Sequence, residues 1–164
     1  MHPFSEPVTA RIAGFLREIG VEVVACELPE PCFLPGVRVD RGRLLVDEGR
    51  LLYPGDLLHE AGHVATLTAA ERGERHGDLG TDLGEEIGAI AWSYAAAVHL
   101  GLDPAVVFHE HGYRGASRGF LDNFRAGRYV GVPLLQWMDL TRDARQAAAE
   151  GVPPYPHMLK WLRD

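Results

Sequence analysis

Apolar positions recur at helical spacing near the N-terminus, and the pattern then changes to short extended runs. Residues 6–19 place apolar side chains on one face, and Gly20 follows where a helix is expected to stop. The apolar runs that come next predict strands at 21–26, 36–39, 43–46 and 51–53. Between the second and third runs, Asp40-Arg41-Gly42 has the composition of a hairpin turn. This part of the chain is expected to form one helix and a small sheet.

Helical patterns dominate the rest of the chain. Asp56 is expected to cap a helix over residues 57–72, and residues 73–84 are expected to form an exposed loop. A long helix is predicted from Asp82 or Gly84 to Leu100. Further helices are predicted at 104–109, 120–126, 133–150 and in a C-terminal segment ending in Trp161 and Leu162. Because no repeat or linker interrupts the pattern, residues 1–164 are expected to form a single domain.

Composition and charge narrow the class of protein. The chain has 164 residues, 46% hydrophobic and 24% charged, which is typical of a globular domain with its own core. A formal net charge of −7 disfavours a general nucleic-acid binder. No apolar run is long enough to span a membrane, and the N-terminal residues lack the pattern of a signal or transit peptide. Cys26 and Cys32 form no CxxC pair, so a cytoplasmic protein with reduced thiols is expected.

The strongest chemical signal is His59-Glu60-Ala61-Gly62-His63, an HExxH motif on a predicted helix. In a chain of this length and composition, chance produces the motif about 0.03 times. The spacing puts His59 and His63 one turn apart on the same face, so both imidazoles can bind one zinc ion. Glu60 lies about 100° around the helix from His59. From there it can take a proton from a zinc-activated water without binding the metal.

A zinc site of this type needs a third protein ligand. The longer HExxHxxGxxH motif is absent, because Thr66 and Ala69 stand where it requires glycine and histidine. A carboxylate is available on the next predicted helix, where Glu85 and Glu86 are adjacent. Small residues on both helices, including Gly62, favour a close approach between them. The spacing alone leaves both Glu85 and Glu86 open as the third ligand.

In this arrangement the sequence resembles the gluzincins, and more narrowly the minimal ImmA/IrrE-type zinc metallopeptidases. In that group a glutamate within a Glu-x-x-Ala pattern follows HExxH, commonly with an aromatic residue three positions after the alanine. Glu86, Ala89 and Trp92 match this register, and the resemblance covers about residues 20–100. The roles that it implies are zinc ligands at His59, His63 and Glu86 and a general base at Glu60.

The resemblance also implies a fold. We expect an α+β, zincin-like single domain whose small, mainly antiparallel sheet packs on the HExxH helix and on a second, glutamate-bearing helix. Residues 101–164 are expected to be a helical C-terminal part without an assigned role. In such a fold an edge strand beside the motif helix can pair with an extended peptide. Residues 43–46 or 51–53 are expected to supply that edge.

Two parts of the expected site are not fixed by the motif. Larger gluzincins carry an acid four residues after the ligand glutamate, which supports a histidine ligand, and here the corresponding positions are apolar. Asp78, Asp82 or a backbone carbonyl is expected to take that role. His109, His111 and Tyr113 are candidates for stabilising the oxyanion that forms during hydrolysis, and the favoured alternative is that this segment is a solvated loop after a helix.

The sequence therefore predicts zinc-dependent hydrolysis of a peptide or amide bond, with a peptide or protein as substrate. The resemblance adds regulatory cleavage of a protein partner as an implied role. The alternative is a non-catalytic metal-binding or protein-interaction module that keeps a zincin scaffold. A third possibility is zinc-dependent hydrolysis of a small amide or of another non-peptide substrate at the same site.

Overall fold

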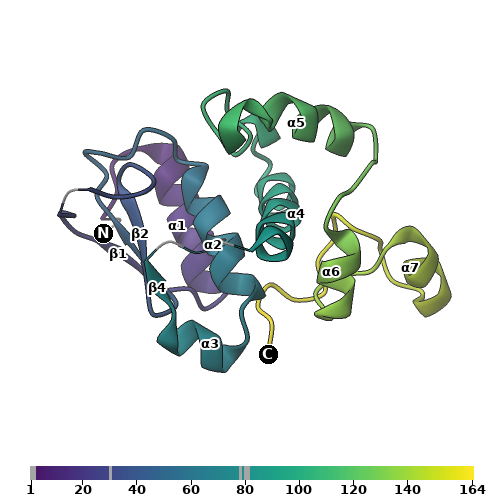
Figure 1. Cartoon of the computed structure of the whole chain (residues 1–164). Helices are drawn as coiled ribbons and strands as arrows, with labels where there is room; N and C mark the ends of the chain where they lie inside the picture. Colours follow the sequence, from purple (N-terminus) through teal and green to yellow (C-terminus); the bar gives the residue numbers. More distant parts are fainter. Residues whose placement is uncertain (1–2, 30, 78, 80–81) are drawn as a thin grey trace.

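The HExxH helix occupies the centre of the molecule. In the computed structural model, which describes residues 3–29, 31–77, 79 and 82–164, this helix is α2 (Asp56–Thr66). It lies between the sheet and the long helix α4 (Leu83–His99), as Figure 1 shows. Every residue of α2 except His59 is buried. Packing on several sides therefore fixes the position of the motif.

Seven α-helices, two short 3-10 helices and four strands form within the described residues. In chain order they are α1 (Pro7–Glu18), β1 (Val23–Ala25), β2 (Val37–Asp40), β3 (Arg43–Val46), α2, α3 (Ala69–Glu74), β4 (His76–Gly77), α4, η1 (Pro104–Val106), η2 (Tyr113–Gly115), α5 (Ser117–Arg125), α6 (Val132–Trp137) and α7 (Ala144–Glu150). The start of α4 follows from local chemistry, because the Asp82 carboxylate accepts hydrogen bonds from the N–H groups of Gly84 and Glu85. The α+β class predicted from the sequence is confirmed.

The sheet is mixed, with the strand order β1-β3-β2-β4. β2 and β3 form the predicted hairpin, and Arg41 and Gly42 at its turn have φ angles of 48° and 81°, as a type I′ turn requires. β1 runs parallel to β3, whereas β4 is antiparallel to β2. Two of the three pairings are thus antiparallel. Helices α1 and α2 pack against this sheet and cover its apolar residues.

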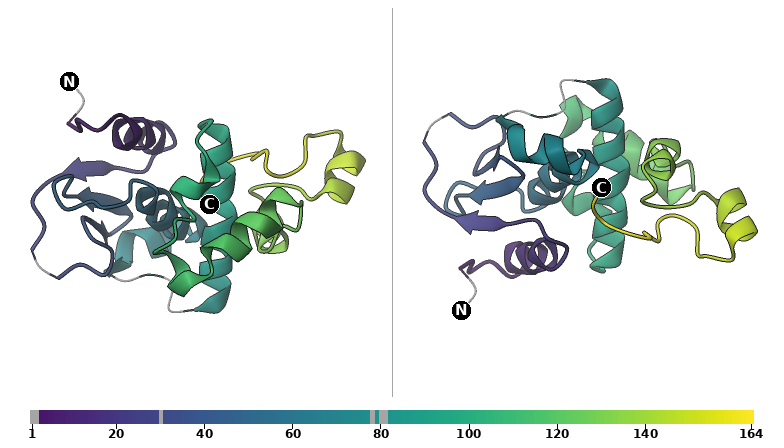
Figure 2. Two further views of the ribbon diagram at one scale, coloured as in Figure 1. Left: turned by 90° about the horizontal axis from the view of Figure 1, so that it is seen from above. Right: turned by 90° about the horizontal axis from the view of Figure 1, so that it is seen from below.

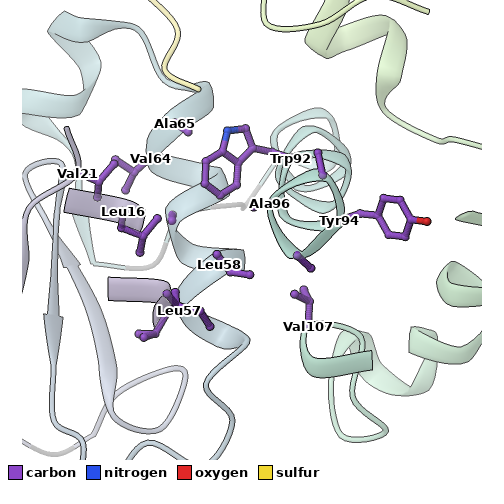
Figure 3. Close-up of a cluster of buried hydrophobic side chains, with 14 of the residues drawn as sticks. Leu16, Val21, Leu57, Leu58, Val64, Ala65, Trp92, Tyr94, Ala96 and Val107 are labelled. Atoms are coloured by element: carbon purple, nitrogen blue, oxygen red, sulfur yellow. The ribbon is translucent and has the colours of Figure 1, made fainter. Parts of the chain in front are cut away.

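The core lies between α1, the sheet, α2 and α4. Figure 3 shows Leu16 of α1 on one side of α2 and Trp92 of α4 on the other. Both side chains are fully buried, and the Trp92 Nε1–H donates to the carbonyl oxygen of Trp161 at 2.9 Å. Buried residues from the C-terminal part, such as Leu135 and Leu140, belong to the same hydrophobic cluster. The C-terminal part thus shares its core with the motif helix.

The last residues of the chain return to the end of the motif helix. The Arg163 N–H donates to the carbonyl oxygen of Ala65 at 2.9 Å, and the Arg72 guanidinium donates to the carbonyl oxygen of Arg163 at 2.7 Å. We call residues 161–163 the C-terminal strap. In Figure 2 the chain end lies against the central helices, whereas α7 projects away from them. The strap satisfies backbone groups where α2 ends.

Helices α2 and α4 come into close contact where Gly62 faces the backbone of Ala89. A Cβ atom at Gly62 would lie 2.8 Å from the Ala89 carbonyl oxygen and 3.1 Å from its Cα atom. Both are backbone atoms, so they cannot move away as the end of a flexible side chain could. The close helix contact predicted from small residues is confirmed, and a larger residue at Gly62 would push the helices apart.

The single helix predicted over residues 57–72 is wrong, because two helices form there. α2 ends at Thr66, the backbone at Leu67 is extended, and α3 begins two residues later. Thr68 and Glu71 form a capping box, in which the Glu71 carboxylate accepts from the Thr68 N–H at 2.8 Å. This sequence therefore carries its own helix start, which interrupts the apolar helical pattern.

Asp56 does not cap α2 as predicted, since it is the first residue of the helix and Gly55 is the N-cap. A Cβ atom at Gly55 would lie 1.8 Å from the carbonyl oxygen of Val106, so only glycine fits this contact. The close approach to η1 decides which residue stands at the cap. The Asp56 carboxylate is consequently available for another contact, described below with the site.

Three predictions in the outer parts of the fold are also wrong. Residues 51–53 form no strand. The edge of the sheet next to β2 is instead β4, which lies within the segment expected to be a loop. The helix predicted at 133–150 is divided into α6 and α7, because Asp139 has a φ of 62° and the Asp143 carboxylate caps α7. The segment that ends at Leu162 is an irregular strap, not a helix. None of the described helices has the length and apolar character needed to cross a membrane.

We predict that Gly62→Ala lowers the free energy of unfolding relative to Gly73→Ala. Both substitutions gain about 1 kcal/mol of helix propensity, but Gly73 is exposed on α3 with no atom near its Cβ position. The difference isolates the cost of forcing α2 and α4 apart, about 1–3 kcal/mol. Urea unfolding followed by circular dichroism measures it. Equal stability of the two variants would show that the helix contact tolerates a methyl group.

Candidate metal centre

Helices α2 and α4 bring two imidazoles and one carboxylate together. The Nε2 atoms of His59 and His63 are 3.2 Å apart. The carboxylate of Glu86 lies 3.0 Å from the His63 Nε2 atom and 3.5 Å from the His59 Nε2 atom. His59, His63 and Glu86 form a metal-compatible group among the described residues. This is the set of ligand residues expected from the motif and the resemblance.

The spacing of these atoms fits a first-row divalent metal ion. Ligands arranged tetrahedrally about 2.0–2.1 Å from zinc lie about 3.3 Å from one another. The Nε2–Nε2 distance of 3.2 Å is close to this value, and each histidine has one Glu86 oxygen nearby, Oε2 at 3.0 Å from His63 and Oε1 at 3.5 Å from His59. Two neutral imidazoles and a carboxylate are also a common donor set of catalytic zinc sites. Donor atoms and distances therefore both fit a metal ion.

Burial puts two of these groups into the protonation states that a metal requires. Burial, reinforced by the neighbouring His63, lowers the pKa of His59 to about 4, so its imidazole is neutral at pH 7. For Glu86, burial opposes the charged form, but the contacts with His63 and His59 outweigh it and lower the pKa of the carboxyl group. A neutral imidazole and an ionised carboxylate bind a cation without first losing a proton.

Glu85 points away from the metal-binding group. Its carboxylate accepts two hydrogen bonds from the Arg75 guanidinium, at 3.1 and 3.2 Å. This bidentate pair links the start of α4 to the residue that follows α3. The structure thus separates the two adjacent glutamates that the sequence left open, with Glu86 beside the histidines and Glu85 in an ion pair.

Tyr113 supports His59, and the sequence did not identify it for this role. The Tyr113 hydroxyl lies 2.8 Å from the His59 Nδ1 atom, and the two rings meet edge to face. Burial raises the pKa of Tyr113 well above its usual value, so the phenol stays protonated. Its oxygen can accept the Nδ1–H proton, which leaves the Nε2 lone pair free for a metal. The sequence indicated Tyr113 only as a candidate for stabilising the oxyanion.

The expected supports for the histidine ligands do not take that place. Asp82 caps α4, and Asp78 lies outside the described residues. The Nδ1 atom of His63 is buried and finds no hydrogen-bond partner in the described part of the chain. The contact between Tyr113 and His59 therefore supplies the supporting interaction at one histidine only.

The segment that carries Tyr113 is held in an uncommon backbone conformation. Tyr113 and Arg114 both have φ angles of 53°, in the left-handed region that non-glycine residues seldom adopt. The Ser117 hydroxyl donates to the carbonyl oxygen of Gly112 at 3.2 Å and closes this turn. Such strain persists only where surrounding contacts fix it. Here the fixed conformation carries the hydroxyl group to His59.

Asp56 and His109 form a second polar pair beside the group. The His109 Nε2 atom lies 2.8 Å from the Asp56 carboxylate, and the His109 ring stacks on Tyr53 at 3.8 Å between ring centroids. Burial raises the pKa of Asp56, although the contact with His109 acts in the opposite direction. The pair ties the first residue of α2 to the segment after η1. It explains the contact that Asp56 makes in place of capping.

The three residues considered for the oxyanion are all occupied by other contacts. His109 contacts Asp56 through Nε2, and its Nδ1 atom is buried without a partner in the described chain. Tyr113 contacts His59, and the exposed His111 pairs with Glu110 at 3.2 Å. The oxyanion role stays a prediction for these residues.

Two adjoining cavities meet at Glu60. The larger, of about 1050 Å³, is lined by His59, Glu86 and Tyr113 among others. The smaller, of about 290 Å³, reaches Gly77 of β4. The Glu60 side chain is almost fully buried, yet it lines both cavities. The motif glutamate thus stands beside the metal-compatible group at the junction of two open spaces.

The predicted substrate edge is not where the sequence placed it. β3 (Arg43–Val46) lies inside the sheet between β1 and β2, and residues 51–53 form no strand. The edge strand next to Glu60 is β4, whose Gly77 lines the smaller cavity. Tyr53, which was expected to belong to this edge, lines the larger cavity, and its ring stacks on His109.

Comparisons with known proteins do not assign this chain to a family. The chain matches no protein-family model, no curated protein and no solved structure. The interpretation of the site therefore rests on its residues, distances and burial.

We predict that Glu86→Gln weakens zinc binding far more than Glu85→Gln does. The first variant removes a charged donor from the group, whereas the second only breaks an ion pair with Arg75. The loss for Glu86→Gln should exceed the roughly 10–100-fold cost of losing a supporting contact. Competition with a zinc chelator gives both affinities. Equal affinities for the two variants would contradict the assignment of Glu86.

Tyr113→Phe is expected to weaken zinc binding about tenfold, because it removes the hydroxyl that supports His59. The control is Tyr129→Phe, which alters a half-buried tyrosine of the aromatic cluster around Tyr94. The same chelator competition applies, with thermal unfolding to compare stability. An unchanged affinity in Tyr113→Phe would show that the hydroxyl group does not support the ligand.

Proposed function

We propose that this protein is a zinc-dependent hydrolase of peptide bonds. The observation that carries the proposal is the convergence of His59, His63 and Glu86 next to a cavity that His59, Glu60 and Glu86 line. A purely structural zinc site is usually closed by four protein ligands, whereas a catalytic site keeps a position open. Three protein donors, of which His59 and Glu86 line a cavity of about 1050 Å³, correspond to the second case.

Zinc is favoured over other metals by the residue next to the first histidine. Two histidines and a carboxylate also bind iron in some oxygenases, and the distances among the donors fit either ion. Glu60 distinguishes the two chemistries, since hydrolysis needs a carboxylate that accepts a proton near the metal without binding it. Glu60 follows His59 directly, lies outside the metal-compatible group and lines the same cavity.

Each residue of the site has a separate role in the proposed hydrolysis. Zinc, when bound, supplies a Lewis acid that lets water lose a proton near neutral pH and that polarises a carbonyl group. Glu60 accepts the proton from the attacking water and later delivers it to the nitrogen of the leaving amine. The hydroxyl group of water ends on the carbonyl carbon, so the C–N bond breaks without any other reactant. His59, His63 and Glu86 hold the ion, and Tyr113 orients His59.

The proposed substrate is a peptide or a protein, cleaved in the manner that the resemblance to ImmA/IrrE-type metallopeptidases implies. The larger cavity, of about 1050 Å³, is at the upper end of the roughly 300–1000 Å³ range of small-molecule sites, so it has room for a stretch of peptide. The competing function is a metal-binding or interaction module without catalysis. Glu60 distinguishes the hydrolase from the non-catalytic module, because only catalysis requires a proton acceptor at that position.

We predict that Glu60→Gln keeps zinc and loses turnover by roughly 10²-fold or more, since an amide cannot accept the proton of water. The measurement is digestion of a broad peptide library, analysed by mass spectrometry, with zinc content and thermal unfolding recorded for each protein. Glu85→Gln is the matched control, because it removes one carboxylate outside both cavities and should retain activity.

Two outcomes would contradict the proposal. Equal cleavage by the wild type and by Glu60→Gln would mean that the activity does not pass through Glu60. Stoichiometric zinc in the wild type without cleavage of any library peptide would favour the non-catalytic module.

A further inference from the structure

The larger cavity has one arginine, Arg114, and no lysine among the described residues that line it. The Arg114 side chain is exposed, and it forms no hydrogen bond or ion pair within the described part of the chain. Two acids of the same cavity are engaged, because Asp56 contacts His109 and Glu86 contacts both histidines of the metal-compatible group. Arg114 is therefore a charge in this cavity that is available to a bound molecule.

The backbone gives Arg114 a fixed position relative to the metal-compatible group. It follows Tyr113 directly, and the Tyr113 hydroxyl lies 2.8 Å from the His59 Nδ1 atom. Arg114 has a φ of 53° and a ψ of 36°, a left-handed conformation that is unfavourable for a residue with a side chain. The Ala116 N–H donates to the carbonyl oxygen of Tyr113 at 3.0 Å and closes the turn. Backbone strain of this kind is concentrated at functional sites, where surrounding contacts maintain it.

The segment around Arg114 is basic, although the protein is acidic. Residues 112–128 contain four arginines and one aspartate, whereas the whole chain has a formal net charge of −7. All four arginines are exposed, and in the described part of the chain only Arg125 pairs with a carboxylate, that of Asp103 at 3.2 Å. Helix α5, which follows Arg114, lies at the edge of the molecule away from the sheet (Figure 1). A local reversal of charge of this kind attracts an anionic partner.

A carboxylate of a peptide fits this geometry better than the phosphates of a nucleic acid. Of the four arginines only Arg114 lines the cavity, and three acids, Asp56, Glu60 and Glu86, line the same space. A row of phosphates would be repelled there, and the net charge of −7 also disfavours a nucleic-acid surface. A single carboxylate can instead accept two parallel hydrogen bonds from the planar guanidinium group.

We propose that Arg114 binds a carboxylate of the substrate and so determines which peptides occupy the larger cavity. This inference rests on the proposed function, because it assigns a specificity-determining residue to the same site. Arg114 lies outside the metal-compatible group, so its role is selection of the substrate and not the chemical step. Two sources supply the same chemistry, namely the side chain of an aspartate or glutamate and the C-terminal carboxylate of a peptide.

Binding of synthetic peptides to the metal-free protein tests the proposal without requiring hydrolysis. The absence of metal also prevents the carboxylate from binding an ion instead of Arg114. The probes are short alanine–leucine peptides, blocked at both ends, with one glutamate moved through every position, together with the matching glutamine peptides. A further set contains glutamine and a free C-terminal carboxylate, which distinguishes the two sources.

NMR chemical-shift changes of isotopically labelled protein give the affinities. At low ionic strength, at least one peptide with a carboxylate is expected to bind about threefold to fivefold more tightly than its blocked glutamine match. A gain restricted to glutamate peptides identifies a side-chain carboxylate, and a gain restricted to the free-ended set identifies the chain terminus. The absence of any gain would overturn the proposal.

Variants that remove one arginine each show where the carboxylate binds. Arg114→Gln should abolish the preference, because glutamine retains polar atoms but carries no charge. Arg118→Gln is the matched control, because Arg118 is also exposed and without a partner in the described chain, but lines neither cavity. Arg38→Gln is a second control, because Arg38 lines only the smaller cavity. Both controls should keep the preference, and circular dichroism confirms that each variant is folded.

Several results would overturn the assignment of Arg114. These are a preference that survives in Arg114→Gln, and a similar loss in either control, which would indicate an effect of overall charge or of the smaller cavity. Binding of a short DNA duplex that Arg114→Gln and Arg118→Gln both weaken, without a preference for carboxylates, would overturn it in favour of a nucleic-acid surface.

The outcome for the hydrolase is separate. A carboxylate preference that depends on Arg114, with no cleavage by the zinc-loaded protein, would support the binding role and refute the hydrolase. Cleavage that responds neither to the carboxylate nor to Arg114→Gln would support the hydrolase and overturn the role of Arg114.

Discussion

The contact between Gly62 and the backbone of Ala89 is the constraint on which the site depends. A motif helix can present two histidines by itself, but the third donor must come from another element at a fixed distance. Because Gly62 has no side chain, α4 lies close enough for the Glu86 carboxylate to reach the His63 imidazole at 3.0 Å. The burial that shifts the pKa of His59 follows from the same packing. The packing of α2 against α4 therefore determines whether these three donors can meet.

Short-range patterns predicted the parts of the fold that depend on local chemistry. The first helix, the β2–β3 hairpin and α4 follow from apolar spacing and turn residues, and all three formed near their predicted bounds. The HExxH spacing brought the histidines together for the same reason. The break between α2 and α3 also had a local signal, the Thr68-x-x-Glu71 capping box, which the dominant apolar pattern obscured.

Contacts between distant residues were beyond sequence reasoning. Tyr113 and His59 are 54 positions apart, and their contact requires a left-handed backbone that no propensity predicts for tyrosine. The sequence predicted Asp56 as the cap, but the close approach of Val106 requires glycine at that position, and Asp56 pairs with His109 instead. The choice of Glu86 over its neighbour depended on Arg75, which engages Glu85 only once the chain has folded. In each case tertiary contacts determine which residue takes the position, and the local sequence does not distinguish the candidates.

The C-terminal strap has a consequence for the time at which the site forms. The N–H of Arg163 completes hydrogen bonding at Ala65, nearly a hundred positions earlier, and the carbonyl oxygen of Trp161 receives the indole proton of Trp92. During synthesis, both helices of the site emerge from the ribosome well before these partners exist. Contacts over such long sequence distances form late in folding. A nascent chain would therefore acquire a fully packed site only after residues 161–163 have been added, so that maturation of the site is timed by chain elongation.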